Sequence, residues 1–202
     1  MTEVSINKTM HLSEHFTLGE LCKTGVKTAD GNIPSHVHIE NLKRVCEWLE
    51  ELRRRYNQQY VCENEERSVS PPELGGARGG LNEGMSGASS DHPAHTGTPP
   101  NLGGEINTDA PIIITSGYRS PELNKKVGGS PTSNHLTGCA VDIRVAGIEQ
   151  AMRYAVILMD YADETRQDYD ELLIEKNSRG AIWLHFAVRH KDNRRKTMFI
   201  QK

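Results

Sequence analysis

The sequence predicts one α+β domain with a small, largely antiparallel sheet and flanking helices. An amphipathic helix is indicated at residues 35–56, and strands are indicated by the β-branched run at 112–115 and the alternating stretch at 139–145. Two further apolar stretches, at 171–175 and 181–188, are joined by a short turn and indicate a hairpin. With 202 residues, the chain is long enough for one domain with a proper core.

The helix after Pro34 has its apolar residues at spacings of three and four, with Glu and Arg on the other side. This pattern is typical of a helix that packs one face on a core, and we expect it to end near Tyr56. A shorter helix or turn is expected at residues 16–22. The apolar positions of the long helix are Ile39, Leu42, Val45, Leu49 and Leu52.

Two helices are expected in the second half of the chain. Ser120 and Pro121 supply an N-cap and a first-turn proline for a short helix that stops at Gly128. A longer helix is predicted from Gly147 to about Thr165, with one apolar stripe in the core. The members of this stripe are Ile148, Met152, Ala155, Met159 and Ala162.

Between Asn57 and Asp109 the composition changes to Gly, Ser and Pro without an apolar period. Such a segment cannot bury enough surface to offset the entropy of ordering it. The residues before it form only one or two helices, too few for an independent core. We therefore interpret 57–109 as a flexible insertion within a single domain that comprises residues 1–202. His92 and His95 inside it are interpreted as an incidental pair, since no helix is expected there.

Composition and charge exclude some classes of partner and indicate where the protein is made. The net charge of −3 and a pI near 6.3 give no sign of a nucleic-acid partner, and the apolar runs are too short to span a membrane. The polar N-terminus carries no visible signal peptide, so we expect synthesis in the cytoplasm. The four cysteines lack metal-type spacing and are expected to be reduced thiols. We expect a monomer.

Three residues form a candidate metal site. His135 ends a loop that enters the alternating strand, and Asp142 lies on the polar face of that strand. His185 lies in a later strand and shares a face with Trp183. Alone, the first two fit a surface hydrogen-bonded pair and His185 fits a satisfied core histidine. Together, two imidazoles and a carboxylate match the ligand set of catalytic zinc, which leaves one position open.

The segments SGYRSPELN, SNHLTGCAVDI and IWLHF resemble the M15 zinc peptidases, which comprise D-Ala-D-Ala carboxypeptidases and phage endolysins. The match includes the S-x-H-x-x-G-x-A-x-D motif in full, and the opening FTLGEL is similar to the start of single-domain members. Coverage is about residues 10–56 and 110–190. The resemblance implies the fold shared with hedgehog signalling domains, Zn²⁺ on His135, Asp142 and His185, and hydrolysis of a peptide bond next to a D-amino acid in peptidoglycan.

The resemblance also implies substrate-binding roles. Arg119, in SGYRS, would hold a carboxylate of the substrate or polarise its carbonyl, which suits a planar guanidinium. Ser133 would donate a hydrogen bond to the substrate. A surface arginine at a helix start and a serine that caps a loop are the structural alternatives for these two residues.

The general base departs from the family pattern. Many relatives have Glu or Asp three residues before the last histidine ligand, and here that position is Ile182, which cannot accept a proton. Glu175 is the nearest substitute, and Glu171 on the same strand face is the second choice; both also fit solvent-facing acids of a hairpin. The missing acid leaves an alternative open, a catalytically inactive zinc-containing module that binds peptidoglycan or another partner.

Overall fold

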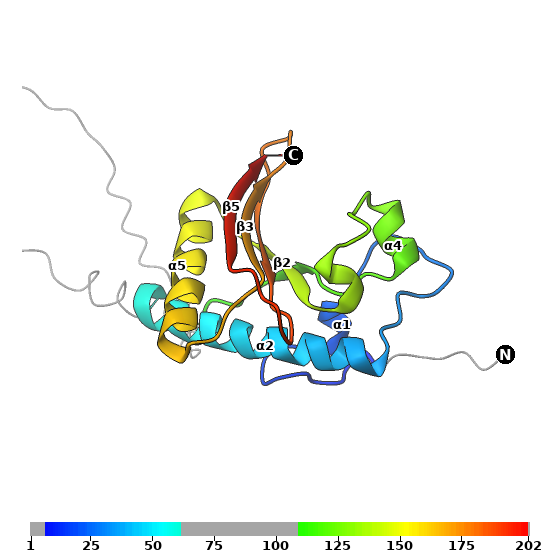
Figure 1. Ribbon diagram of the computed structural model, residues 1–202, viewed down its shortest axis with the longest axis horizontal. Coiled ribbons are helices and arrows are strands. Elements are labelled where there is room, and N and C mark those ends of the chain that lie inside the picture. Colours follow the sequence, from blue (N-terminus) through cyan, green and yellow to red (C-terminus); the bar gives the residue numbers. More distant parts are fainter. Residues whose placement is uncertain (1–6, 62–108, 202) are drawn as a thin grey trace, which may run out of the picture.

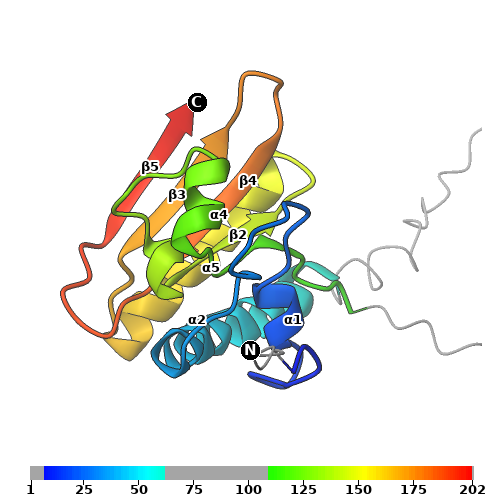
Figure 2. The same ribbon diagram turned by 90° about the vertical axis from the view of Figure 1, so that its right-hand side faces the viewer.

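The computed structural model describes residues 7–61 and 109–201. A five-stranded sheet with the order β1-β2-β4-β3-β5 forms its centre, and helices lie on both sides (Figures 1 and 2). Neighbouring strands are antiparallel except for β3 and β5, which run parallel. The predicted α+β class with a largely antiparallel sheet is therefore confirmed. The strands are β1 (Ile114–Ser116), β2 (Ala140–Arg144), β3 (Glu171–Lys176), β4 (Ile182–Ala187) and β5 (Lys196–Gln201).

Two long helices cover one face of the sheet (Figure 1). They are α2 (His36–Tyr56), which ends at the predicted residue, and α5 (Ile148–Thr165). Ser35 caps α2, because its hydroxyl accepts a hydrogen bond from the backbone N–H of His38. Trp48 of α2 is buried against Phe186 of β4, and both rings belong to the main core.

The opposite face of the sheet carries short elements and loops (Figures 1 and 2). These elements are α1 (Leu18–Leu21), α4 (Pro121–Lys126) and the 3₁₀ helix η2 (Asn134–Thr137). Ser120 caps α4 and Pro121 occupies its first turn, as predicted. Side chains alternate along β4, so Leu184 and Phe186 face the long helices while His185 faces the short elements.

Three details of the sequence-based prediction are wrong. In α5 the predicted Ala155 and Ala162 are buried and Met159 packs on the core, but Ile148 and Met152 are about half exposed. The rest of the buried face is formed by Ala151, Tyr154, Ile157 and Leu158. The strand expected at residues 112–115 begins at Ile114. Strand β5 was not predicted, because its exposed side chains on the sheet edge lack the apolar alternation of a half-buried strand.

The first residues of the expected insertion are helical: η1 (Asn57–Val61) continues α2 as a π-helical turn. Asn57 also joins the two chain segments, since its side chain accepts a hydrogen bond from the N–H of Ala110 at 2.8 Å. The flexibility predicted for 57–109 otherwise concerns residues 62–108, which lie outside the described part, as do His92 and His95. Within the described residues, no helix is long and apolar enough to cross a membrane, and the cysteines there are unpaired.

Candidate metal centre

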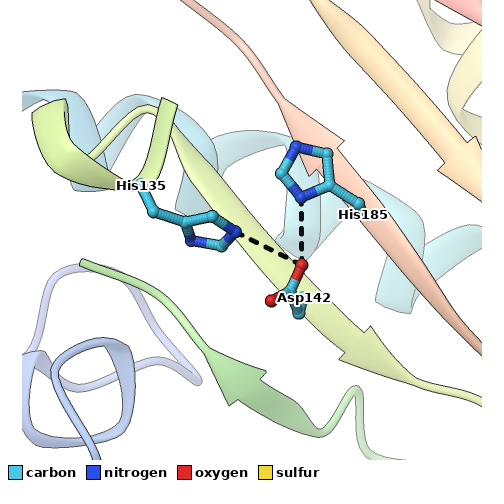
Figure 3. Close-up of side chains that lie close together, drawn as sticks. All are labelled: His135, Asp142 and His185. Atoms are coloured by element: carbon cyan, nitrogen blue, oxygen red, sulfur yellow. Dashed lines mark hydrogen bonds and ion pairs between the residues drawn. The ribbon is translucent and has the colours of Figure 1, made fainter. Parts of the chain in front are cut away.

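His135, Asp142 and His185 converge on one point of the sheet face opposite the long helices (Figure 3). Oδ1 of Asp142 lies 3.3 Å from Nε2 of His135 and 2.9 Å from Nδ1 of His185. One ligand atom from each residue lies within 4.8 Å of the other two, and all three residues are buried. Tertiary structure thus brings together the three residues that the sequence nominated.

The sheet register places two of the three side chains. Asp142 on β2 is paired directly with His185 on β4, so both side chains leave the sheet on the same face. Directly opposite residues of antiparallel strands have Cβ atoms about 5 Å apart, which is the spacing that two ligands of one ion need. A shift of one residue in this register would turn one of the two ligands to the other face.

Two glycines place His135. Gly138 ends η2 with φ of +72°, and a Cβ there would lie 2.6 Å from the carbonyl oxygen of His38. Gly117 approaches α1 so closely that a Cβ would lie 2.1 Å from the carbonyl oxygen of Leu21. The carbonyl of Gly117 accepts a hydrogen bond from Nδ1 of His135 at 2.7 Å. The other ring nitrogen, Nε2, is therefore the one with a lone pair for a ligand.

Arg119 contacts the second carboxylate oxygen of Asp142. Its Nη2 donates to Oδ2, and its Nε donates to the hydroxyl of Ser116 at 2.8 Å. Its backbone N–H also donates to the carbonyl of His135 at 3.0 Å. Oδ1 is consequently the oxygen that faces both histidines. Arg119 lies at the site as the resemblance implies, but these contacts orient a ligand.

The charges at the site favour a positive charge at its centre. Burial lowers the pKa of His135. Burial also opposes protonation of His185, but its hydrogen bond to Asp142 and the nearby carboxylate of Glu171 outweigh it and raise the pKa of His185 to about 9. For Asp142, burial would raise the pKa, but the two histidines together hold it well below its usual range.

The donor set and spacing fit Zn²⁺. In tetrahedral coordination at about 2.1 Å, ligand atoms lie about 3.4 Å apart. The distances from Oδ1 of Asp142 to the two histidine nitrogens, 3.3 and 2.9 Å, are close to that value. The hydrogen bond from His135 to Gly117 and that from Arg119 to Asp142 are the outer contacts that orient ligands in zinc sites.

Glu171 lies beside His185, with 3.6 Å between its Oε2 and Nε2 of the ring. The same carboxylate accepts a hydrogen bond from Asn134 at 3.0 Å and pairs with Arg194 at 3.0 Å and Lys196 at 3.5 Å. The close contact with His185, aided by these cations, lowers the pKa of Glu171 to about 2. A carboxylate with so low a pKa is a weak base.

Glu175 lies on the same face of β3 as Glu171. It is buried and pairs with Trp183 across the sheet, whereas His185 pairs with Leu173. Glu175 is thus a diagonal neighbour of His185, and its charge is one of the influences that raise the pKa of that histidine. Neither carboxylate faces bulk solvent as a free hairpin acid would.

Ser133 caps η2. Its hydroxyl accepts a hydrogen bond from the backbone N–H of His135 at 3.3 Å, so the structural alternative for this serine is realised. The hydroxyl hydrogen is not used in that contact, and donation to a substrate stays a prediction.

Sequence reasoning missed Asn134, which braces the loop that carries His135. Its amide donates to buried Asp170 at 2.7 Å, and its oxygen accepts from Nε of Arg189 at 2.9 Å. Asp170 also accepts two hydrogen bonds from Arg194, from Nε at 2.8 Å and from Nη2 at 2.6 Å. An asparagine next to a ligand was the available signal, but its partners are about 35 to 55 residues away in the sequence.

Asn32 is the second residue that was missed. It is buried with φ of +53°, and its side chain bonds the carbonyls of Cys22 and Tyr118 and the N–H of Ser120, at 3.0, 3.1 and 2.7 Å. Tyr118 and Ser120 flank Arg119, so Asn32 fixes the backbone from which the arginine reaches Asp142.

Fold and site define an α+β protein with a buried two-histidine, one-carboxylate centre on the sheet face opposite the long helices. A family model described as Peptidase M15 matches residues 105–168. This match, over about a third of the chain, supports a relationship to the M15 peptidases, whose members are zinc-dependent. His135 and Asp142 lie within the matched segment, and His185 lies beyond it. No curated protein matches the chain.

Proposed function

We propose that this protein is a zinc peptidase that hydrolyses a peptide bond next to a D-amino acid in peptidoglycan stem peptides, as a carboxypeptidase or an endolysin-type endopeptidase. The observation that carries the proposal is the convergence of His135, Asp142 and His185, together with the Peptidase M15 match. The sequence resemblance supplies the substrate class and the hedgehog/DD-peptidase-like form of the fold. No nucleic acid takes part, and a monomer suffices for the reaction.

In this proposal, His135, Asp142 and His185 would hold Zn²⁺, and Nε2, Oδ1 and Nδ1 are the atoms that face the centre. When bound, the ion would activate the attacking water and polarise the scissile carbonyl. Gly117 keeps the ring of His135 in the correct tautomer by accepting from its Nδ1. Arg119 holds Oδ2 of Asp142, which leaves Oδ1 to the ion.

Glu175 is proposed to accept the proton of the attacking water and return it to the leaving amine. Two observations favour it over Glu171. The carboxylate of Glu171 is occupied by Asn134, Arg194 and His185, and its pKa is about 2. Glu175 is buried on the same face, two positions further along β3 than the residue paired with His185. Burial keeps a base away from competing water.

Substrate placement is proposed for Ser133 and Arg119. The serine hydroxyl can donate to a substrate carbonyl while it still caps η2. Arg119 would meet the substrate only with guanidinium positions that Ser116 and Asp142 leave available. Its main contribution in this scheme is therefore to hold Asp142.

The test is digestion of purified peptidoglycan with zinc-loaded protein, followed by mass spectrometry of the muropeptides. We expect products that differ by cleavage at one D-amino-acid bond, and no such products with His135→Ala. Zinc-loaded protein that binds cell-wall fragments but releases no product would refute the proposal and favour the inactive binding module, which the apolar Ile182 at the family's base position would allow.

A further inference from the structure

A groove of about 500 Å³ lies at the end of β2 and β4, beside the metal centre. Thr115, Arg144 and Trp183 contribute side chains to its wall, and the turns at residues 145–147 and 180–182 complete it. Thr115 connects the groove wall to the metal centre, because its hydroxyl donates a hydrogen bond to the backbone carbonyl of Asp142 at 3.0 Å.

The sheet register fixes how far the groove lies from the metal centre. Asp142 pairs with His185, and two residues further along the same strands Arg144 pairs with Trp183. Side chains two residues apart on a strand share a face, so Arg144 and Trp183 leave the sheet on the side of the metal centre. Two residues of a strand span about 6.8 Å. An extended peptide that passes over the centre would cover this distance in about two residues.

Arg144 gives the groove its chemistry. Its side chain is exposed and forms no hydrogen bond or ion pair with any residue of 7–61 or 109–201. Arg119, which follows the neighbouring strand β1, is by contrast bound to Asp142. A guanidinium without a counter-ion beside an aromatic ring is well suited to a carboxylate, which it can bind with two parallel hydrogen bonds. Trp183 offers the adjoining apolar surface for the rest of the peptide.

We propose that this groove is a carboxylate-binding subsite, in which Arg144 binds a free carboxylate of the peptide about two residues from the scissile bond. The inference rests on the proposed peptidase function and names its substrate class, an acidic peptide. The carboxylate is either an acidic side chain or the terminal α-carboxylate.

The experiment uses synthetic stem peptides in which one carboxylate at a time is replaced by its primary amide. One arm amidates the acidic side chain, and the other amidates the C-terminus. The amide is close in size to the carboxylate but uncharged. For zinc-loaded wild-type protein, we expect one of the two amidations to lower kcat/KM by about 10- to 100-fold, mostly through KM, because a charge-assisted bidentate contact is lost away from the reacting atoms. The arm that responds identifies the source of the carboxylate.

Arg144→Gln should reduce that preference to about twofold or less, Arg144→Lys should restore part of it, and Arg144→Glu should make the amide the better substrate. Lys191→Gln is the control, because Lys191 is an exposed cation in a different groove that shares no residue with this one. An unchanged preference in Arg144→Gln, or a preference that disappears in Lys191→Gln instead, would overturn the subsite. Zinc content and thermal unfolding of each variant show that the centre and the fold are intact.

A second readout does not need turnover. The chain has two tryptophans, and Trp48 is 1% exposed, so quenching of fluorescence by acrylamide reports on Trp183. A peptide with the carboxylate should protect Trp183 in wild-type protein and not in Arg144→Gln. Protection without cleavage would refute the peptidase proposal and leave the subsite standing. Cleavage at the same rate with and without each carboxylate would refute the subsite and leave the peptidase proposal standing. If the peptide is neither cleaved nor protects Trp183, both proposals are refuted.

Discussion

Asn32 lies outside the metal centre, yet we expect its replacement to weaken zinc binding. Its side chain bonds the backbone on both sides of Arg119, at Tyr118 and Ser120. The segment it holds supplies both the guanidinium that orients Asp142 and the Gly117 carbonyl that orients His135. Asn32→Gly is the cleanest change, because glycine accepts the φ of +53° without strain and only the side chain is lost.

The size of the effect follows from the contacts. Asn32 forms three hydrogen bonds to backbone groups while 1% exposed. At about 0.5 to 1.5 kcal/mol each, their loss should cost roughly 2 to 4 kcal/mol of the free energy of unfolding. At about 2 to 4 °C per kcal/mol for a chain of this size, Tm should fall by roughly 5 to 15 °C. Zinc affinity should fall about tenfold, at the low end of effects seen for residues that orient ligands.

The assay is competitive titration with a chromophoric zinc chelator, alongside thermal unfolding of the metal-free protein. Leu158→Ala is the matched control: Leu158 of α5 is fully buried in the core, and its truncation should cost about 2 to 5 kcal/mol without touching the site. If Asn32→Gly and Leu158→Ala are destabilised alike and both bind zinc as tightly as wild type, Asn32 is a structural residue only and the reasoning fails.

Three further predictions follow from the same contacts. Glu175→Gln should lower turnover by about 100- to 10,000-fold without loss of zinc, whereas Glu171→Gln should be much milder; a large loss only at Glu171 would show that the other carboxylate is the base. Purified wild-type protein should hold about one zinc per chain, and His135→Ala should lose most of it. Chelation should lower the Tm of the wild type but not that of this variant. Wild-type protein that contains no zinc and that added zinc does not activate would contradict the site. Replacing residues 62–108 with about six Gly and Ser residues should preserve zinc binding and add at most ~2 kcal/mol of stability through cheaper loop closure, and a large fall in Tm would show that the segment packs on the core.

The helices of this protein could largely be predicted from local sequence. Ser120 and Pro121 define the start of α4, and the apolar period of α2 is confirmed up to Tyr56. The face of α5 could not be chosen, because apolar residues lie on more than one side of it and Met152 is exposed where the buried stripe was expected. Strand β5 could not be predicted from local sequence, because its pairing with β3 is parallel and depends on contacts between residues about 25 positions apart.

The candidate ligands themselves were determined by the sequence, since two histidines and an aspartate at these positions match a zinc-binding motif and their residue types are the donors that zinc prefers. Only the tertiary structure decided what surrounds them. The register of β2 against β4 makes Asp142 and His185 neighbours, and it leaves Arg144 beside the groove. The tertiary structure also brings Arg119 within hydrogen-bond distance of Asp142, 23 residues further along the chain. A sequence lists donors and acceptors, but which of them pair depends on distances that exist only after the strands have aligned.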